Sequence, residues 1–230
     1  ATETADFSGS IGLGARTALL EELADLDAQK AKLTQKRGRV LLEDAREHIL
    51  KSGVADVTTS LRYGDLAETV QELETDAHMI VVGKRGEAAD FAKLHLGSNL
   101  ERVVRSTQRP ILVASRKFEP VSKLLIAFDG GESANKAIDH MIRSQIFSGI
   151  SCHLLMVGDA DHATREQVEA AAAQLREAGY DASCDVKPGQ PENVIAAEVE
   201  AGGYELLVMG AYGHSRIRNL IIGSTTTEMI

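Results

Sequence analysis

Two glycine patterns in this sequence have the residue types and the spacing needed to hold a phosphate group. The later pattern places Gly210 and Gly213 directly after an apolar run and ends in Gly223, Ser224 and Thr225. A glycine loop followed by a helix N-terminus offers backbone N–H groups to an anion, and the partial positive charge of the helix end favours negative charge. The pattern therefore predicts phosphate binding by main-chain amides.

A second copy of the pattern occurs earlier in the chain, after the apolar run 79–82. Its spacing differs, because ten residues rather than nine separate its second and third glycines. Glu87 and Asp90 place carboxylates in its loop, where they would repel a polyphosphate, and Lys84 and Arg85 offset them only in part. The sequence therefore predicts that this first site binds phosphate weakly or stays empty. Its members are Gly83, Gly86, Gly97 and Ser98.

Polar residues lie between the glycines of the later pattern. His214 and Ser215 could suggest a nucleophile and its base, but they are adjacent in sequence and no carboxylate orients the histidine, so we predict no catalytic residue. Arg216 and Arg218 are open to two interpretations, as solvated loop residues or as groups that neutralise phosphate. The pattern is not a Walker A loop, because no Gly-Lys-Ser/Thr is present, and a GxGxxG fingerprint is absent around Gly210.

Composition narrows the range of partners. The formal net charge of −9 argues against a general nucleic-acid binder and against binding to an anionic membrane. The two cysteines, Cys152 and Cys184, form no CxxC and no metal-ligand spacing, which predicts reduced thiols and no metal site. No apolar run approaches the ~20 residues of a membrane span and no signal peptide is visible, so we expect a cytoplasmic protein.

The elements that must position the later pattern are short apolar strands alternating with helices. Such alternation predicts right-handed βαβ units and a parallel sheet covered on both faces. Ser133 is the expected cap of the first helix, a capping box at Thr164 and Gln167 opens the second, and Pro191 begins the third. The predicted strands are 124–128, 152–157, 182–186 and 206–209.

The earlier half shows only the latter part of this plan. Residues 15–52 are helical in period, with Gly38 as a point where that helix could divide. Strands are expected at 57–62, 79–82 and 111–114, and helices at 66–74 and 98–107. The second half of the chain has no counterpart of strand 111–114, and the first half has no counterpart of 124–157. We therefore expect strands at both ends to lie outside this sequence; the alternative is a permuted assembly in which the second half completes the first sheet.

These residues resemble the universal stress protein family, whose sequences carry G-x2-G-x9-G-(S/T). The stretch 210–226 matches that spacing, and the Asp-Gly-Gly-Glu-Ser stretch 129–133 after the first strand resembles the family's first turn. The resemblance implies an α/β fold of two tandem Rossmann-like, adenine-nucleotide alpha hydrolase-like domains with doubly wound parallel sheets. The domains would span 1–115 and 123–230, with 116–122 as a linker.

The resemblance also implies a ligand, which is ATP or, in its place, AMP or ADP. Mg²⁺ could bind together with the nucleotide. Asp129 would accept hydrogen bonds from the ribose or the adenine side, and the backbone of Val157 would contact adenine. The implied role is a sensor or regulator of the stress response with slow hydrolysis at most, paired within the chain and further as a homodimer. The alternatives are a structural or chaperone-like member that binds no nucleotide, and an enzyme such as an adenylating transferase, for which no added motif is found. The cofactor-binding residues expected in the second domain are Asp129, Val157, Gly210, Gly213, Arg216, Gly223, Ser224 and Thr225.

Overall fold

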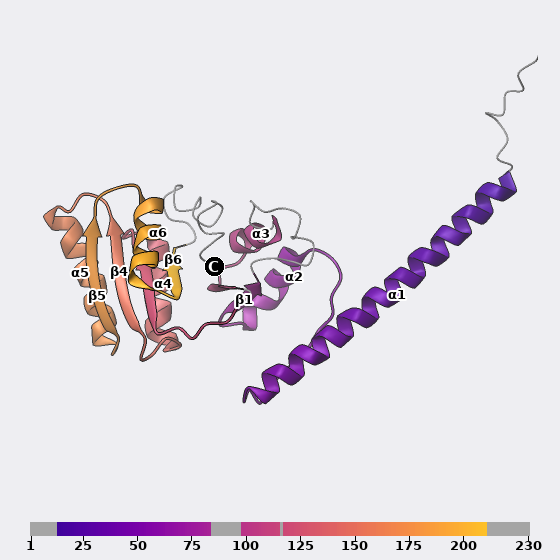
Figure 1. The fold of residues 1–230 in the computed structure, drawn as a ribbon, viewed down its shortest axis with the longest axis horizontal. Helices are drawn as coiled ribbons and strands as arrows, with labels where there is room; N and C mark the ends of the chain where they lie inside the picture. Colours follow the sequence, from indigo (N-terminus) through magenta and orange to yellow (C-terminus); the bar gives the residue numbers. More distant parts are fainter. Residues whose placement is uncertain (1–12, 84–97, 116, 211–230) are drawn as a thin grey trace, which may run out of the picture. The chain divides into compact units, whose positions relative to one another are not determined.

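The computed structural model describes residues 13–83, 98–115 and 117–210. The chain divides into two compact units, Ala1–Tyr63 and Gly64–Ile230, and each is described by itself (Figure 1). Among the described residues, no helix combines the length and the apolar character that crossing a membrane requires.

The first unit consists of one helix and the segment that follows it. Helix α1 spans Leu13–Lys51 and continues through Gly38, so this glycine does not divide it. A Cβ at Gly38 would lie 2.9 Å from Cδ1 of Leu61, which shows that the segment after the helix lies against this position. The glycine therefore makes room for a side chain rather than ending the helix.

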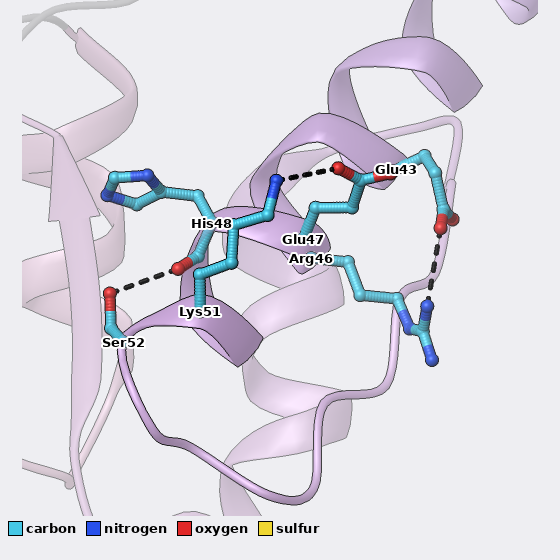
Figure 2. Close-up of polar contacts among 6 residues, drawn as sticks. All are labelled: Glu43, Arg46, Glu47, His48, Lys51 and Ser52. Carbon is cyan, nitrogen blue, oxygen red and sulfur yellow. Dashed lines mark hydrogen bonds and ion pairs between the residues drawn. The ribbon is translucent and has the colours of Figure 1, made fainter.

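The last turns of α1 are held by short-range polar contacts (Figure 2). Lys51 pairs with Glu47 at 3.1 Å, Arg46 pairs with Glu43 at 3.3 Å, and the Ser52 hydroxyl donates to the His48 carbonyl at 3.0 Å. Each contact spans three or four residues and so joins neighbours on the helix surface.

The strand expected at 57–62 is absent, and this prediction was wrong. Residues 54–62 form neither helix nor strand in the structure. A strand needs a partner for its backbone groups, whereas this segment follows α1 and packs Leu61 onto Gly38. The sequence of 57–62 therefore resembles a strand although the segment is not part of a sheet in the structure.

The second unit begins with two short helices and a two-stranded parallel sheet. Strands β1 (Ile80–Gly83) and β2 (Ile111–Ala114) pair with Ile80 opposite Ile111. Helix α2 (Leu66–Leu73) is capped by Asp65, whose side chain accepts from the Ala67 N–H at 2.9 Å. A 3-10 turn, η1 (Glu74–Asp76), follows α2, and α3 (Ser98–Ser106) precedes β2.

A four-stranded parallel sheet follows in the same unit, with the order β5-β4-β3-β6. Ala127 of β3 lies opposite Leu155 of β4 and Met209 of β6. The predicted parallel sheet is thus confirmed, with β3 and β6 as neighbours although far apart in sequence. The strands are β3 (Lys123–Ala127), β4 (Ser151–Val157), β5 (Asp181–Lys187) and β6 (Leu206–Met209).

Three helices cover the two faces of this sheet (Figure 1). Alternate residues of β3 point to opposite faces, so Leu124 and Ile126 join a cluster with α4 and α5, whereas Leu125 joins a cluster with Ile195 of α6. Because helices cover both faces of the sheet and exclude water, the sequence of the inner strand β3 is an almost continuous apolar run. The helices are α4 (Glu132–Ser144), α5 (His162–Glu177) and α6 (Pro191–Gly202).

Two of the expected helix starts differ from the structure. Helix α4 begins at Glu132, so Ser133 lies inside its first turn and does not cap it. Helix α5 begins at His162, because Asp161 caps it by accepting from the Thr164 N–H at 2.8 Å. An aspartate three residues upstream satisfies the free amide at Thr164 and moves the helix start ahead of the predicted capping box.

Candidate functional site

Two of the residues predicted from the sequence, Asp129 and Gly210, lie where the carboxyl ends of β3 and β6 meet. Asp129 follows β3 after Phe128, whose N–H donates to the Leu155 carbonyl at 3.0 Å and extends the ladder. Gly210 follows β6 directly. In parallel sheets ligands bind beyond the carboxyl ends of the strands, and the pairing of β3 with β6 brings these two segments to one edge.

Gly210 is packed against the start of α4. A Cβ at this position would lie 2.8 Å from Cβ of Ser133 and 3.0 Å from the backbone N of Ala134. The first distance is shorter than real Cβ atoms approach one another, and the second is tighter than most real contacts. The neighbouring atoms belong to the helix backbone or are bonded directly to it, so they cannot rotate away. The close approach of β6 to the α4 N-terminus therefore requires glycine.

Asp129 shapes the turn between β3 and α4. Its Oδ1 accepts a hydrogen bond of 2.9 Å from the Gly131 N–H, which is an Asx-type turn. Gly130 has φ +71°, and a Cβ there would lie 2.2 Å from Nε2 of Gln167. Gln167 was expected to form a capping box with Thr164. Its side chain instead packs against Gly130, so that α5 contacts the turn.

The N-terminus of α4 is aimed at the same edge. Its N-cap, Gly131, makes no side-chain hydrogen bond to the helix. The first N–H groups of a helix have no partner within it, so those of Glu132 and Ser133 are available to an anion or to water. The Glu132 carboxylate pairs with Lys136 at 2.6 Å, and this hydrogen bond and charge lower the pKa of Glu132.

Val157 ends the neighbouring strand β4, opposite Lys187 of β5. The following residue, Gly158, donates its N–H to the Lys187 carbonyl at 3.0 Å. The Lys187 ammonium pairs with Glu198, and that hydrogen bond raises the pKa of the lysine. Sequence reasoning missed this lysine, because a lone cation at the end of a strand carries no motif.

The structure thus brings together Asp129, Val157 and Gly210 at one edge of the four-stranded sheet. In the earlier half, Gly83 ends β1 opposite Ala114, and Ser98 begins α3. The remaining predicted site residues lie outside the described part of the chain: Gly86, Gly97, Gly213, Arg216, Gly223, Ser224 and Thr225.

Neither thiol is poised for chemistry. Burial raises the pKa of Cys152 and of Cys184 to about 11 in each case, and for Cys184 the hydrogen bond to Glu169 at 3.0 Å adds to the effect. Both are therefore protonated near neutral pH. Within the described ranges no cluster of His, Cys, Asp and Glu is arranged to hold a metal ion.

Comparisons with known proteins agree on one family. The model of the universal stress protein family matches residues 9–115 and again residues 120–230. A universal stress protein of Synechocystis sp. is 36% identical over 232 residues, which is 100% of this chain and 81% of that protein.

Solved structures resemble the fold. A universal stress protein from Archaeoglobus fulgidus DSM 4304 superimposes with a TM-score of 0.63 at 23% identity, over 85% of this chain and 72% of that one. A putative universal stress protein from Pseudomonas aeruginosa UCBPP-PA14 gives a TM-score of 0.56 at 15% identity, over 84% and 75% of the two chains. At these identities the likeness concerns the fold alone.

Proposed function

The chain belongs to the universal stress protein family, and on that premise we propose that the edge formed by β3 and β6 binds an adenine nucleotide. The proposed ligand is ATP, with AMP or ADP as alternatives. The nucleotide-binding domain is 123–230, joined by the linker 116–122 to a first domain, 1–115. The bound nucleotide serves a regulatory or sensing role in the stress response.

One observation supports this proposal above the others, namely the contact between Gly210 and the start of α4. The glycine follows β6, and a Cβ added to it would lie 3.0 Å from the Ala134 backbone nitrogen, so the end of the strand closely approaches the start of the helix. The glycine pattern at 210–226 consequently begins next to a helix N-terminus that has no side-chain cap. Backbone amides and a helix dipole at one point are what a phosphate needs.

The proposal assigns a role to each part of the nucleotide. Asp129 accepts hydrogen bonds from the ribose, because its Oδ1 bond to Gly131 fixes the carboxylate at the strand end. The backbone at Val157 meets the adenine. The phosphates lie on the amides of the 210–226 pattern, and Arg216 neutralises part of their charge. The phosphate-binding residues are Gly210, Gly213, Gly223, Ser224 and Thr225.

Mg²⁺ would accompany ATP through the phosphate oxygens. No cluster of three acidic or histidine side chains in the described ranges offers a cage for it. Mg²⁺ is commonly held by substrate phosphates with one or two protein ligands, so the described residues fit an ion that arrives with the nucleotide. The proposal includes slow hydrolysis at most.

The earlier half is proposed as the weaker site. Its glycine loop carries Glu87 and Asp90, and those carboxylates oppose a polyphosphate. The proposal therefore places one nucleotide per chain, in the second domain.

The test is to purify the full chain, extract its bound small molecules and titrate the stripped protein with ATP. Gly213→Val adds a branched side chain where the proposal has the backbone approach phosphate, so binding should be lost. Gly158→Ala is the matched control at the same edge, because nothing lies within 4 Å of a Cβ there. Adenylate that binds the wild type and Gly158→Ala but not Gly213→Val supports the site; equal binding by Gly213→Val contradicts it.

A further inference from the structure

Glu192, in the first turn of α6, has a carboxylate oxygen that is closed off from solvent. None of the residues that the structure describes donates a hydrogen bond to this atom, Oε2. Leaving a buried polar atom unpaired costs free energy, and in native proteins such atoms usually find a donor in the protein, in water or in a ligand. This oxygen is therefore a candidate to accept a hydrogen bond from a bound molecule.

The start of α6 does not use this carboxylate as a cap. Pro191, the first residue of the helix, has no N–H group. The N–H groups of Asn193 and Val194 both donate to the Gln190 carbonyl, at 3.1 and 3.0 Å. The partial positive charge of the helix end favours a carboxylate here, but these two N–H groups already have a backbone partner.

Glu192 lies on the side of α6 that faces the sheet. At 3.6 residues per turn it shares this side with Ile195 and Val199. Ile195 is 2% exposed and belongs to the cluster that contains Leu125 and Leu155 of the sheet. The exposed residues of α6 lie around the opposite side: Asn193, Ala197, Glu200 and Ala201.

The first turn of α6 also lies at the carboxyl edge of the sheet. The chain leaves β5 at Lys187 and enters α6 only four residues later, so the helix starts where the parallel strands end. Val157 and Met209, the last residues of β4 and β6, pack against the same cluster as Ile195. Glu192 precedes Ile195 by three residues, or about 4.5 Å along the helix toward this edge. Its carboxylate therefore lies beside the edge where we place the nucleotide.

Position and charge decide which part of the nucleotide Glu192 can meet. Helices α4 and α6 cover opposite faces of the sheet, and the proposed phosphate position lies at the start of α4. A carboxylate repels phosphate, and in the proposed site Mg²⁺ accompanies the phosphate oxygens. Asp129, which meets the ribose in the proposal, also lies in the turn into α4. The part that remains on the α6 side, next to Val157, is the base.

We propose that Glu192 selects adenine by accepting a hydrogen bond from the exocyclic amino group at position 6 of the base, an inference that rests on the proposed function. An ionised carboxylate can only accept hydrogen bonds, and the amino group donates them. Hypoxanthine and guanine carry an oxygen at position 6, and two acceptors would then face each other. A site built around such a hydrogen bond rejects a ligand that lacks the donor, so the site prefers adenylates to inosine and guanosine nucleotides.

The first experiment titrates the stripped full chain with ATP and with inosine triphosphate (ITP), which differ only at position 6 and in the proton at N1. The wild type should prefer ATP roughly tenfold or more. Glu192→Gln should bind ATP more weakly and ITP more tightly, because an amide can also donate to the oxygen of ITP. Glu200→Gln, an exposed carboxylate on the same helix, should keep the wild-type preference.

Opposite changes for the two nucleotides cannot come from a general loss of structure. A preference that Glu192→Gln leaves unchanged, in a chain that binds ATP, overturns the inference and leaves the proposed function standing. Equal weakening of ATP and ITP also overturns it, because the carboxylate would then support the fold and not the choice of base. A wild-type chain that binds neither nucleotide overturns the inference and the proposed function together.

The same titrations in excess EDTA separate the base from the metal ion. The shift in preference caused by Glu192→Gln should persist without Mg²⁺, because the amino group is still present. A shift that occurs only with Mg²⁺ would make Glu192 a ligand of the ion and would overturn the inference.

A denaturant titration of the nucleotide-free chain tests whether the protein itself supplies a partner. Glu192→Gln should unfold at the same denaturant concentration as the wild type, because no hydrogen bond of the described residues is lost. Glu198→Gln weakens the pair with Lys187 and should unfold at a lower concentration. Equal destabilisation in the two variants would reveal a protein donor to Glu192 and would overturn the inference.

Discussion

The carboxylate of Glu205 accepts a hydrogen bond of 2.8 Å from the backbone N–H of Lys123, which joins the residue before β6 to the first residue of β3. The same carboxylate accepts from the Ser122 N–H at 3.2 Å and from the Ser122 hydroxyl at 3.1 Å. The pairing of β3 with β6 is thus fixed at its amino end by one side chain. At the carboxyl end of the same pair, Gly210 packs on α4.

The Glu205 contact predicts a pH dependence of stability. The Lys123 and Ser122 hydrogen bonds lower the pKa of Glu205 below its ordinary value of 4.5, so they favour the charged form in the folded state. The stabilisation is therefore present above that ordinary value and is lost as pH falls through the lowered pKa. Thermal unfolding of Glu205→Gln should show a weaker loss of stability on acidification than the wild type. Glu200→Gln, at an exposed carboxylate of α6, is the control, and an equal change in both variants would contradict the assignment.

Gly210 should tolerate no side chain. Gly210→Ala brings a Cβ within 2.8 Å of Ser133 Cβ, and overpacking of this kind costs about 1–3 kcal/mol. Gly158→Ala, with open space at its Cβ, should be nearly neutral in a denaturant titration. We also expect Gly210→Ala to weaken adenylate binding, because the shift moves β6 away from α4. Equal stability of the two alanine variants would show that this close approach is not a constraint.

Asp129 shapes the turn after β3, and in the proposed site it also accepts a hydrogen bond from the ribose. Two substitutions separate these roles. Asp129→Asn keeps an oxygen that accepts from the Gly131 N–H, so its stability should match that of the wild type. Asp129→Ala removes the acceptor and should lose about 1 kcal/mol. Both should bind adenylate roughly tenfold or more weakly, since a charge-assisted hydrogen bond to ribose is lost. Unchanged affinity in both variants would remove Asp129 from the proposed site.

The buried hydroxyl of Tyr180 holds the end of α4. It donates to the Met141 carbonyl at 2.8 Å, and the tyrosine is only 5% exposed. The Met141 carbonyl also accepts from the Gln145 N–H at 3.1 Å, so Tyr180→Phe removes one of two hydrogen bonds and should cost about 0.5–1.5 kcal/mol of unfolding free energy. Tyr63→Phe, at a residue 64% exposed, should cost nothing measurable. A neutral Tyr180→Phe would mean that water replaces the donor.

Strands β3, β4 and β6 could be predicted closely because each is a short, mostly apolar run. Strand β5, at the edge of the sheet, instead alternates between buried and more exposed residues. The run 206–209 is β6 itself, and Pro191 begins α6 as expected. Because both faces of the sheet are buried, the inner strands lack alternating polar residues and stand out in the sequence as apolar runs. The pairing of β3 with β6 places Asp129 and Gly210 at one edge of the sheet.

Other features depend on contacts between distant residues, which local patterns do not contain. Segment 57–62 resembles a strand, yet Leu61 packs on a helix. Asp161 rather than Thr164 caps α5, because two candidates three residues apart compete and only the packed helix decides between them. The contact of Gln167 with Gly130 joins residues far apart in the chain, so no spacing rule could reveal it.

The central claim is that the edge at Asp129 and Gly210 holds an adenine nucleotide, and calorimetric titration of the stripped full chain tests it most directly. ATP should release heat that saturates at one nucleotide per chain, while Gly213→Val should show none and Gly158→Ala should match the wild type. A wild-type chain that gives no binding heat with ATP, ADP or AMP would contradict the claim.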